Sequence, residues 1–168
     1  TMFVRMCKLP EEVRMKYESI LYEVKDNILT ITLNRPDKLN AFNYSMQSDL
    51  INAIDRANDD DEVKAIIVTG AGRGYCAGAD LSAGKDTFNM EARDDRKGAI
   101  SDNGEIDWSH SGVRDGGGRV TLKMFECLKP IISACNGPAV GVGLTMQLAM
   151  DIRLASEEAK YGFVFARR

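Results

Sequence analysis

The sequence predicts an α/β fold in which parallel strands alternate with helices. The predicted elements follow one another as strand, helix, strand, helix and strand, an order typical of parallel crossovers. Residues 65–69 form a continuous apolar run rich in β-branched side chains, as in a strand buried on both faces. Two glycine-rich turns, at 70–81 and 136–143, directly follow predicted strands. No linker or internal repeat divides the 168 residues, so one domain is expected.

The first predicted element is a β-hairpin. Residues 22–24 and 28–33 are runs of β-forming side chains, and Asp26-Asn27 between them is a typical hairpin turn. Pro36 ends the second strand, because proline has no N–H group for the hydrogen-bond ladder.

A helix with one apolar face is expected next, with Ser45 as its N-cap. The apolar positions recur at helical spacing and comprise Met46, Leu50, Ile54 and Ala57. The acidic residues 59–61 are expected to form a solvated loop rather than a metal cluster, and they lead into the strand at 65–69.

Residues 91–118 interrupt this pattern, because they are polar, charged and glycine-rich with only isolated apolar side chains. A mobile surface excursion with room for one short helix is expected there. A helix that carries Val120, Met124 and Leu128 on one face should follow and end at Lys129-Pro130. The remaining predicted elements are a strand at 131–135, a helix at 141–150 and a strand at 152–155.

The composition excludes several classes of function. The 22 basic and 25 acidic residues give a net charge of -3, without the basic face that nucleic-acid binding needs. The single histidine, His110, excludes a site built on several histidines. The four cysteines form no CxxC pair, so we expect free thiols in a reducing cytoplasm rather than zinc ligands or disulfides. They are Cys7, Cys76, Cys127 and Cys135.

Residues 130–150 carry no charged side chain and approach the length of a membrane-spanning helix. Asn136, Gly137 and Pro138 interrupt the run and divide it into a strand, a turn and a helix. No membrane span is therefore expected. Asp151 follows the run and is expected to tether a turn.

The two glycine-rich turns are candidate binding loops. A dinucleotide-binding fingerprint would need glycine in place of Tyr75, and the Gly-Lys-Ser/Thr of a P-loop is absent. The second turn leads into a helix, and the free N–H groups at a helix N-terminus attract negative charge. Two such donors facing one point would form an oxyanion hole. The plain alternative is that both segments are tight turns whose glycines serve packing.

Three sequence blocks resemble the crotonase (enoyl-CoA hydratase/isomerase) superfamily. They are ITLNRP at 31–36 with Asn40-Ala41, YCAGADL at 75–81, and KPIISACNGPAVG at 129–141. The blocks occur in the family's order and span most of the chain. The resemblance implies a crotonase-type ββα spiral that binds acyl-CoA thioesters. No cofactor is implied, because coenzyme A is part of the substrate.

The resemblance also implies roles for individual residues. The backbone N–H groups of Ala79 and Val142 would form the oxyanion hole that holds an enolate. Asp80 is expected to bond backbone amides and fix its loop, and Lys85 either approaches a CoA phosphate or has no role. The residues implied in substrate binding are Lys38, Leu39, Ala41, Ala77, Gly78, Asp80, Leu81 and Gly141.

The chain departs from the family's hydratases at two positions. Thr145 and Phe165 stand where those enzymes have glutamates, and neither side chain can replace a carboxylate in general acid–base work. The sequence Asn-Gly-Pro-Ala at 136–139 is similar to the peroxisomal-type Δ3,Δ2-enoyl-CoA isomerases. Their single catalytic glutamate follows the position of Phe165, so it would fall beyond Arg168. We therefore expect residues 1–168 to be one crotonase-like domain that lacks the family's C-terminal helices.

The expected function is that of an enoyl-CoA hydratase/isomerase-type enzyme, in fatty-acid or related acyl-CoA metabolism. The family implies a homotrimer or a dimer of trimers for the full-length protein. Two alternatives stay open. One is a non-catalytic acyl-CoA-binding module on the same fold, and the other is a CoA-ester hydrolase or decarboxylase, because the residues opposite an oxyanion hole decide the reaction.

Overall fold

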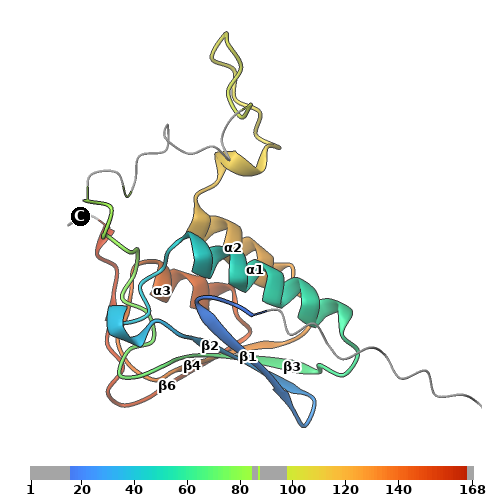
Figure 1. Ribbon diagram of the computed structural model, residues 1–168, viewed down its shortest axis with the longest axis vertical. Coiled ribbons are helices and arrows are strands. Elements are labelled where there is room, and N and C mark those ends of the chain that lie inside the picture. Colours follow the sequence, from blue (N-terminus) through green and yellow to red (C-terminus); the bar gives the residue numbers. More distant parts are fainter. Residues whose placement is uncertain (1–15, 85–86, 88–97, 166–168) are drawn as a thin grey trace, which may run out of the picture.

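The computed structural model of the chain describes residues 16–84, 87 and 98–165 (Figure 1). Lys85 and residues 91–97 of the expected excursion lie outside the described residues. Within them, one five-stranded sheet carries three helices on one face, and a long hairpin-like segment rises beyond the helices (Figure 1).

The sheet has the strand order β1-β2-β3-β4-β6. The first pair is antiparallel and the following three pairs are parallel, which confirms the α/β prediction. Asp26 and Asn27 join β1 and β2 with φ angles of 51° and 64°, the paired positive values of a tight hairpin turn. The strands are β1 (Ile20–Lys25), β2 (Ile28–Leu33), β3 (Ala65–Gly70), β4 (Ile131–Cys135) and β6 (Ile152–Ala155).

The expectation that β3 is buried on both faces is wrong. Ile66 and Val68 are fully buried, whereas Ile67 between them is only half-buried. The reason is that α1, α2 and α3 all lie on the same face of the sheet (Figure 1), so alternate side chains of the strand point away from the helices.

Helix α1 (Tyr44–Asp59) buries the predicted apolar face but begins with a different cap. Asn43, not Ser45, is the N-cap, and its side chain accepts a hydrogen bond from Met46 N at 2.9 Å. The Ser45 hydroxyl instead donates to Glu18 Oε2 at 2.6 Å. Both residue types cap helices well, so the sequence alone could not separate two candidates two residues apart.

Helix α2 (Gly116–Phe125) ends earlier than predicted. Val120 and Met124 are buried, but Leu128 is 90% exposed, so its assignment to the buried face is wrong. The chain has already left the helix there, and Leu128 N donates to Asn58 Oδ1 at 3.1 Å. The Leu128 N–H is thus paired with a side chain of α1 instead of with a carbonyl of a further helical turn.

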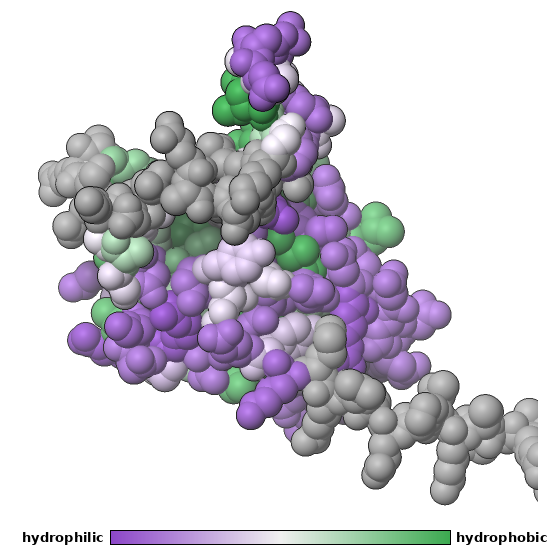
Figure 2. Space-filling model, turned by 45° about the horizontal axis from the view of Figure 1, so that its top comes forward, coloured by the Kyte–Doolittle hydropathy of each residue, from purple (hydrophilic) through white to green (hydrophobic). Residues whose placement is uncertain are grey.

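The expected excursion is partly ordered structure. Ile100 and Ile106 form an antiparallel bridge, a 3-10 helix (Ser111–Val113) follows, and α2 begins inside the predicted segment at Gly116. Figure 2 shows a hydrophilic tip on this hairpin above a hydrophobic patch. Ile100, in the bridge, is 58% exposed.

The helix predicted at 141–150 is divided. One turn of α-helix, α3 (Val142–Thr145), continues as the 3-10 helix η5 (Met146–Ala149). A two-stranded parallel sheet of β5 (Ala139–Val140) and β7 (Tyr161–Gly162) was not predicted. Among the described residues, we find no helix with the length and apolar character needed to cross a membrane.

Candidate functional site

The two glycine-rich turns lie against each other at the carboxyl ends of β3 and β4. Tyr75 N and Cys76 N both donate to Pro138 O, at 3.1 and 3.2 Å, and Val140 N donates to Cys76 O at 2.9 Å. Gly78 has a φ of +94°, and a Cβ placed on it would lie 3.0 Å from Val140 O. Only glycine combines this backbone conformation with so close an approach between the turns.

Two asparagine side chains fasten the turns to their surroundings. The fully buried Asn40 donates to Ala71 O at 2.9 Å and to Gly74 O at 2.8 Å. Asn136 donates to Gly72 O at 2.9 Å and accepts from Gly70 N at 3.1 Å. Both asparagines belong to the sequence blocks at 31–41 and 129–141, but no role was predicted for them. The available signal was a polar side chain next to a glycine turn, which can satisfy the turn's free backbone groups.

The N–H groups of Ala79 and Val142 donate to no acceptor within the described part of the chain. Around Ala79, Phe42 N donates to Gly78 O and Asp80 N donates to Phe42 O, each at 2.8 Å, which leaves the Ala79 N–H outside the pairing. Val142 is the first residue of α3, and its cap residue Gly141 offers no side-chain acceptor.

These two free donors belong to adjacent stretches of backbone. A Cβ placed on Gly141 would lie 3.8 Å from Gly78 Cα, so the residues immediately before Val142 and Ala79 are close neighbours. The start of α2 packs against the Val142 side chain, because a Cβ on Gly117 would lie 2.7 Å from Val142 Cγ2. Two unpaired N–H groups on neighbouring turns are a suitable arrangement for binding one oxygen that carries negative charge.

Asp80 is held by neighbouring groups, as expected. It accepts from Ser82 N at 2.9 Å and forms an ion pair with Arg35, with 2.8 Å between Nη2 and Oδ2. Hydrogen bonds from Ser82, together with the Arg35 guanidinium, lower the pKa of Asp80 to about 2. Arg35 also donates to Ala41 O, so it joins the segment after β2 to the first turn. An ionised carboxylate committed to these partners fixes the loop.

The remaining residues implied in substrate binding lie along the same edge. Leu39 O accepts from Ala77 N at 3.0 Å, which places these two residues side by side. Ala41 is buried and adjoins Phe42, which pairs with the turn. Lys38 is exposed at the end of a 3-10 helix, and Leu81 is 46% exposed beyond the turn.

Thr145 and Phe165 both lie next to the second turn. Thr145 N donates to Gly141 O at 2.9 Å, and its hydroxyl is 3.5 Å from Val142 O. Ring carbons of Phe165 lie 3.8 and 4.0 Å from the position of a Cβ on Gly141. A hydroxyl group and a phenyl ring, rather than two carboxylates, thus lie next to Gly141 and Val142.

A further carboxylate, Asp115, lies near this place and was not among the predicted site residues. Its Oδ1 is 3.3 Å from the position of a Cβ on Gly117, the residue that packs on Val142. Asp115 is the N-cap of α2 and accepts from Gly118 N at 2.6 Å. Its observed task is therefore to cap the helix.

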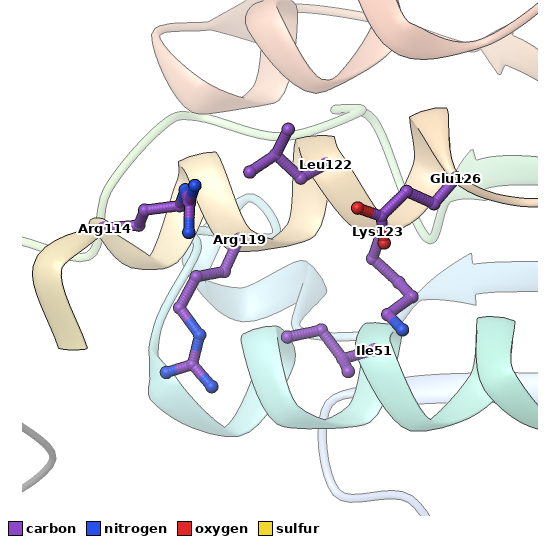
Figure 3. A pocket seen from close by; sticks show the side chains of 6 residues that line it. All are labelled: Ile51, Arg114, Arg119, Leu122, Lys123 and Glu126. Atoms are coloured by element: carbon purple, nitrogen blue, oxygen red, sulfur yellow. The ribbon is translucent and has the colours of Figure 1, made fainter. Parts of the chain in front are cut away.

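Two hollows lie elsewhere on the described surface. One of about 210 Å³ lies between α1 and α2 (Figure 3). Lys123, which lines it, is already paired with Asp55 at 2.8 Å. Its lining residues are Ile51, Arg114, Arg119, Leu122, Lys123 and Glu126. The second, of about 250 Å³, lies under the hairpin and is lined by Ala99, Ile100, Ile106, Trp108 and Val113. Neither contains Ala79 or Val142, so the candidate site is defined by the free donors rather than by cavity size.

Comparison with known proteins identifies the family. The family model described as enoyl-CoA hydratase/isomerase matches residues 23–167. The chain therefore belongs to the enoyl-CoA hydratase/isomerase family, and the resemblance to the crotonase superfamily is confirmed.

Individual relatives agree with this assignment. An enoyl-CoA hydratase from Alternaria alternata is 39% identical over 143 residues, which are 85% of this chain and 42% of the relative. The 1,2-epoxyphenylacetyl-CoA isomerase of Escherichia coli is 34% identical over 150 residues, 89% of this chain and 52% of the relative. The chain spans about half the length of the curated relatives it matches.

A solved structure confirms the crotonase-type fold. The crystal structure of an enoyl-CoA hydratase/isomerase from Xanthobacter autotrophicus superposes with a TM-score of 0.67 at 33% identity. The match covers 88% of this chain and 49% of that chain.

Proposed function

We propose that the protein to which this chain belongs acts on acyl-CoA thioesters and holds the thioester oxygen between the Ala79 and Val142 N–H groups. The supporting observation is that both groups are unpaired within the described residues and that the residues before them, Gly78 and Gly141, are close neighbours. As a thioester is deprotonated at the α-carbon, charge develops on its carbonyl oxygen. Preorganised donors aimed at that oxygen typically contribute about 3–4 kcal/mol each in the transition state.

The proposed reaction is a proton shift on an enoyl-CoA. A base removes a proton from the carbon next to the thioester, and the electron pair moves onto the carbonyl oxygen. The resulting enolate returns the electrons to carbon as a proton is added at another position of the conjugated system. The double bond has then moved, and no other atom is gained or lost.

This reaction is favoured over hydration because of Thr145 and Phe165. Adding water across the double bond needs an acid and a base that handle the water, and neither side chain supplies one. Asp80 is unsuited as the base, since a carboxylate with a pKa of about 2 and an Arg35 partner accepts protons poorly. The proposed base is a carboxylate from the part of the protein outside this sequence.

The substrate would lie along the edge formed by the first turn and the segment after β2. We propose that Lys38, Leu39 and Ala41 line the coenzyme A end, and that Ala77, Gly78, Asp80, Leu81 and Gly141 form the wall near the thioester. Coenzyme A would enter as part of the substrate, with no separate cofactor. A cytoplasmic role in fatty-acid or related acyl-CoA metabolism, on one domain, belongs to the same proposal.

A homotrimer or dimer of trimers is the proposed assembly of the full-length protein. All four residues of the edge strand β6 are exposed, including Ile152 at 50% and Leu154 at 58%. Apolar side chains on an open strand edge are normally covered, by another part of the chain or by a second subunit.

The second candidate function is a non-catalytic acyl-CoA-binding module, which the side chains of Thr145 and Phe165 favour. Both candidates are tested by incubating the full-length protein with a 3-enoyl-CoA and following the absorbance of the conjugated 2-enoyl product. Hydration of crotonyl-CoA is measured in parallel. Isomerisation without hydration is the expected result. Saturable binding of both thioesters with no product would replace the proposed reaction by the binding function.

A further inference from the structure

The first turn of α3 is held by a side chain that the proposed mechanism does not use. Gln147 lies in the 3-10 helix that continues α3, and it is only 1% exposed. A fully buried amide is costly unless its donor and acceptor groups are paired. The donor and the acceptor of the Gln147 amide must therefore find partners inside the protein.

Both ends of the Gln147 amide are paired. Nε2 donates to Gly143 O at 2.7 Å, and Oε1 accepts from the Ser133 hydroxyl at 2.8 Å. Ser133 lies in β4 and is itself fully buried. One side chain thus connects the central sheet to the residue that follows Val142.

The opposite side of Gly143 is also fixed. A Cβ placed on Gly143 would lie 2.5 Å from Cys76 O and 2.6 Å from Cys76 Cβ. The backbone of α3 therefore packs directly against Cys76 in the first glycine-rich turn. The Cys76 thiol is neutral, because burial raises its pKa to about 11. Gly143 is therefore held between Cys76 of the first glycine-rich turn and the neutral, hydrogen-bonded amide of Gln147.

We propose that Gln147 is a positioning residue that sets the direction of the Val142 N–H. The inference rests on the proposed function, since it concerns how the oxyanion donor is aimed. The α-helix lasts for only one turn after Val142, and its backbone hydrogen bonds are local, from Leu144 N and Thr145 N to Gly141 O at 3.0 and 2.9 Å. The Ser133–Gln147–Gly143 connection is what ties that turn to the central sheet. Misplacing an aligned group by about 1 Å can cost on the order of 100-fold in rate.

The test uses the full-length protein with Gln147→Met, which keeps the volume of the side chain but removes both hydrogen bonds. The matched control is Leu148→Met, one residue further along the same 3-10 helix, where the side chain is 60% exposed. The probe is 2,4-hexadienoyl-CoA, a conjugated thioester whose absorption moves to longer wavelength when its carbonyl is polarised. Turnover of a 3-enoyl-CoA and the melting temperature are measured beside it.

Gln147→Met is expected to lower kcat by about 10- to 100-fold, with KM changed less than about threefold, and to reduce the absorption shift of the bound probe. Leu148→Met should leave all of these unchanged. A lower melting temperature with wild-type kcat and a wild-type absorption shift would overturn the inference, because the amide would then serve stability alone.

Two further variants keep the test decisive if Gln147→Met does not fold. Ser133→Ala removes only the hydroxyl donor to Oε1, and Gln147→Glu keeps the length of the side chain. Each should reduce the absorption shift in part, and a full shift in both would refute the positioning role. A wild-type protein that binds the probe without any shift would instead refute the oxyanion hole, so the two failures are distinguishable.

Discussion

Replacing Val142 by proline tests the oxyanion donor with little other disturbance. Proline at the first position of a helix is well tolerated, because the N–H it lacks has no helical partner there. Proline also disfavours the α conformation in the preceding residue, but Gly141 has φ 54° and ψ -123° and lies outside it. The variant therefore deletes the donor while the backbone of α3 is kept.

The expected loss of kcat in Val142→Pro follows from the unpaired state of the Val142 N–H within the described residues. Val142 N donates to no acceptor in the described residues, so its removal breaks no observed hydrogen bond of the folded chain. Removing one donor from an oxyanion hole costs about 2.7–4 kcal/mol, which corresponds to roughly 100- to 1,000-fold in kcat. Stability should change little, because no paired group is lost.

The assay is steady-state isomerisation of a 3-enoyl-CoA by the full-length protein, with melting temperatures recorded for each variant. Val142→Ala is the control, since it keeps the N–H and loses only side-chain contacts such as that near Gly117. It should retain kcat within about threefold. Equal kcat values for Val142→Pro and the wild type, with folding intact, would refute the assignment of this donor.

Three other predictions concern charge, capping and packing. The ion pair of Asp80 with Arg35 should add stability above pH about 4 that is lost as pH falls through 2, because the folded-state pKa lies below the ordinary 3.8. Asp80→Asn should remove that part of the pH dependence in denaturant titrations, and an unchanged profile would count against the pair. Asp115→Asn should keep kcat within about threefold, since asparagine caps as well as aspartate, whereas a loss near 1,000-fold would make Asp115 a base. Leu50→Ala should cost about 2–5 kcal/mol and Leu128→Ala less than about 0.5 kcal/mol, and chemical denaturation with equal costs would contradict the described core.

Much of the sheet could be predicted from local patterns. The run at 131–135 and the hairpin at 20–33 contain enough β-forming residues to be predicted as strands without tertiary information. The two-residue strands β5 and β7 could not be found in this way. Their pairing depends on chain segments 22 residues apart that meet only in the folded molecule.

Element ends were less predictable than elements. Leu128 continues the helical spacing of Val120 and Met124, yet its N–H donates to Asn58 on α1 instead of to a helical carbonyl. That contact joins residues 70 positions apart, and no local sequence pattern predicts it. A helical pattern in the sequence can therefore extend beyond the helix itself.

The candidate site could be predicted only through resemblance. Ala79 and Val142 would act through backbone N–H groups, which every residue except proline possesses, so their side chains carry no signal. Gln147 did carry one, because it is an amide in a run of 21 residues without charge, at 130–150. A polar side chain in such a run must find buried partners, and Ser133 and Gly143 supply them.

The most direct test of the oxyanion hole is the carbonyl stretching frequency of crotonyl-CoA, labelled with carbon-13 at the thioester, when bound to the full-length protein. Infrared difference spectra need no turnover, so they apply to the catalytic and the binding function alike. If both N–H groups hold the oxygen, the band should lie below its position in water and move back toward that position in Val142→Pro. A bound thioester whose band stays at the water value in the wild-type protein would contradict the account.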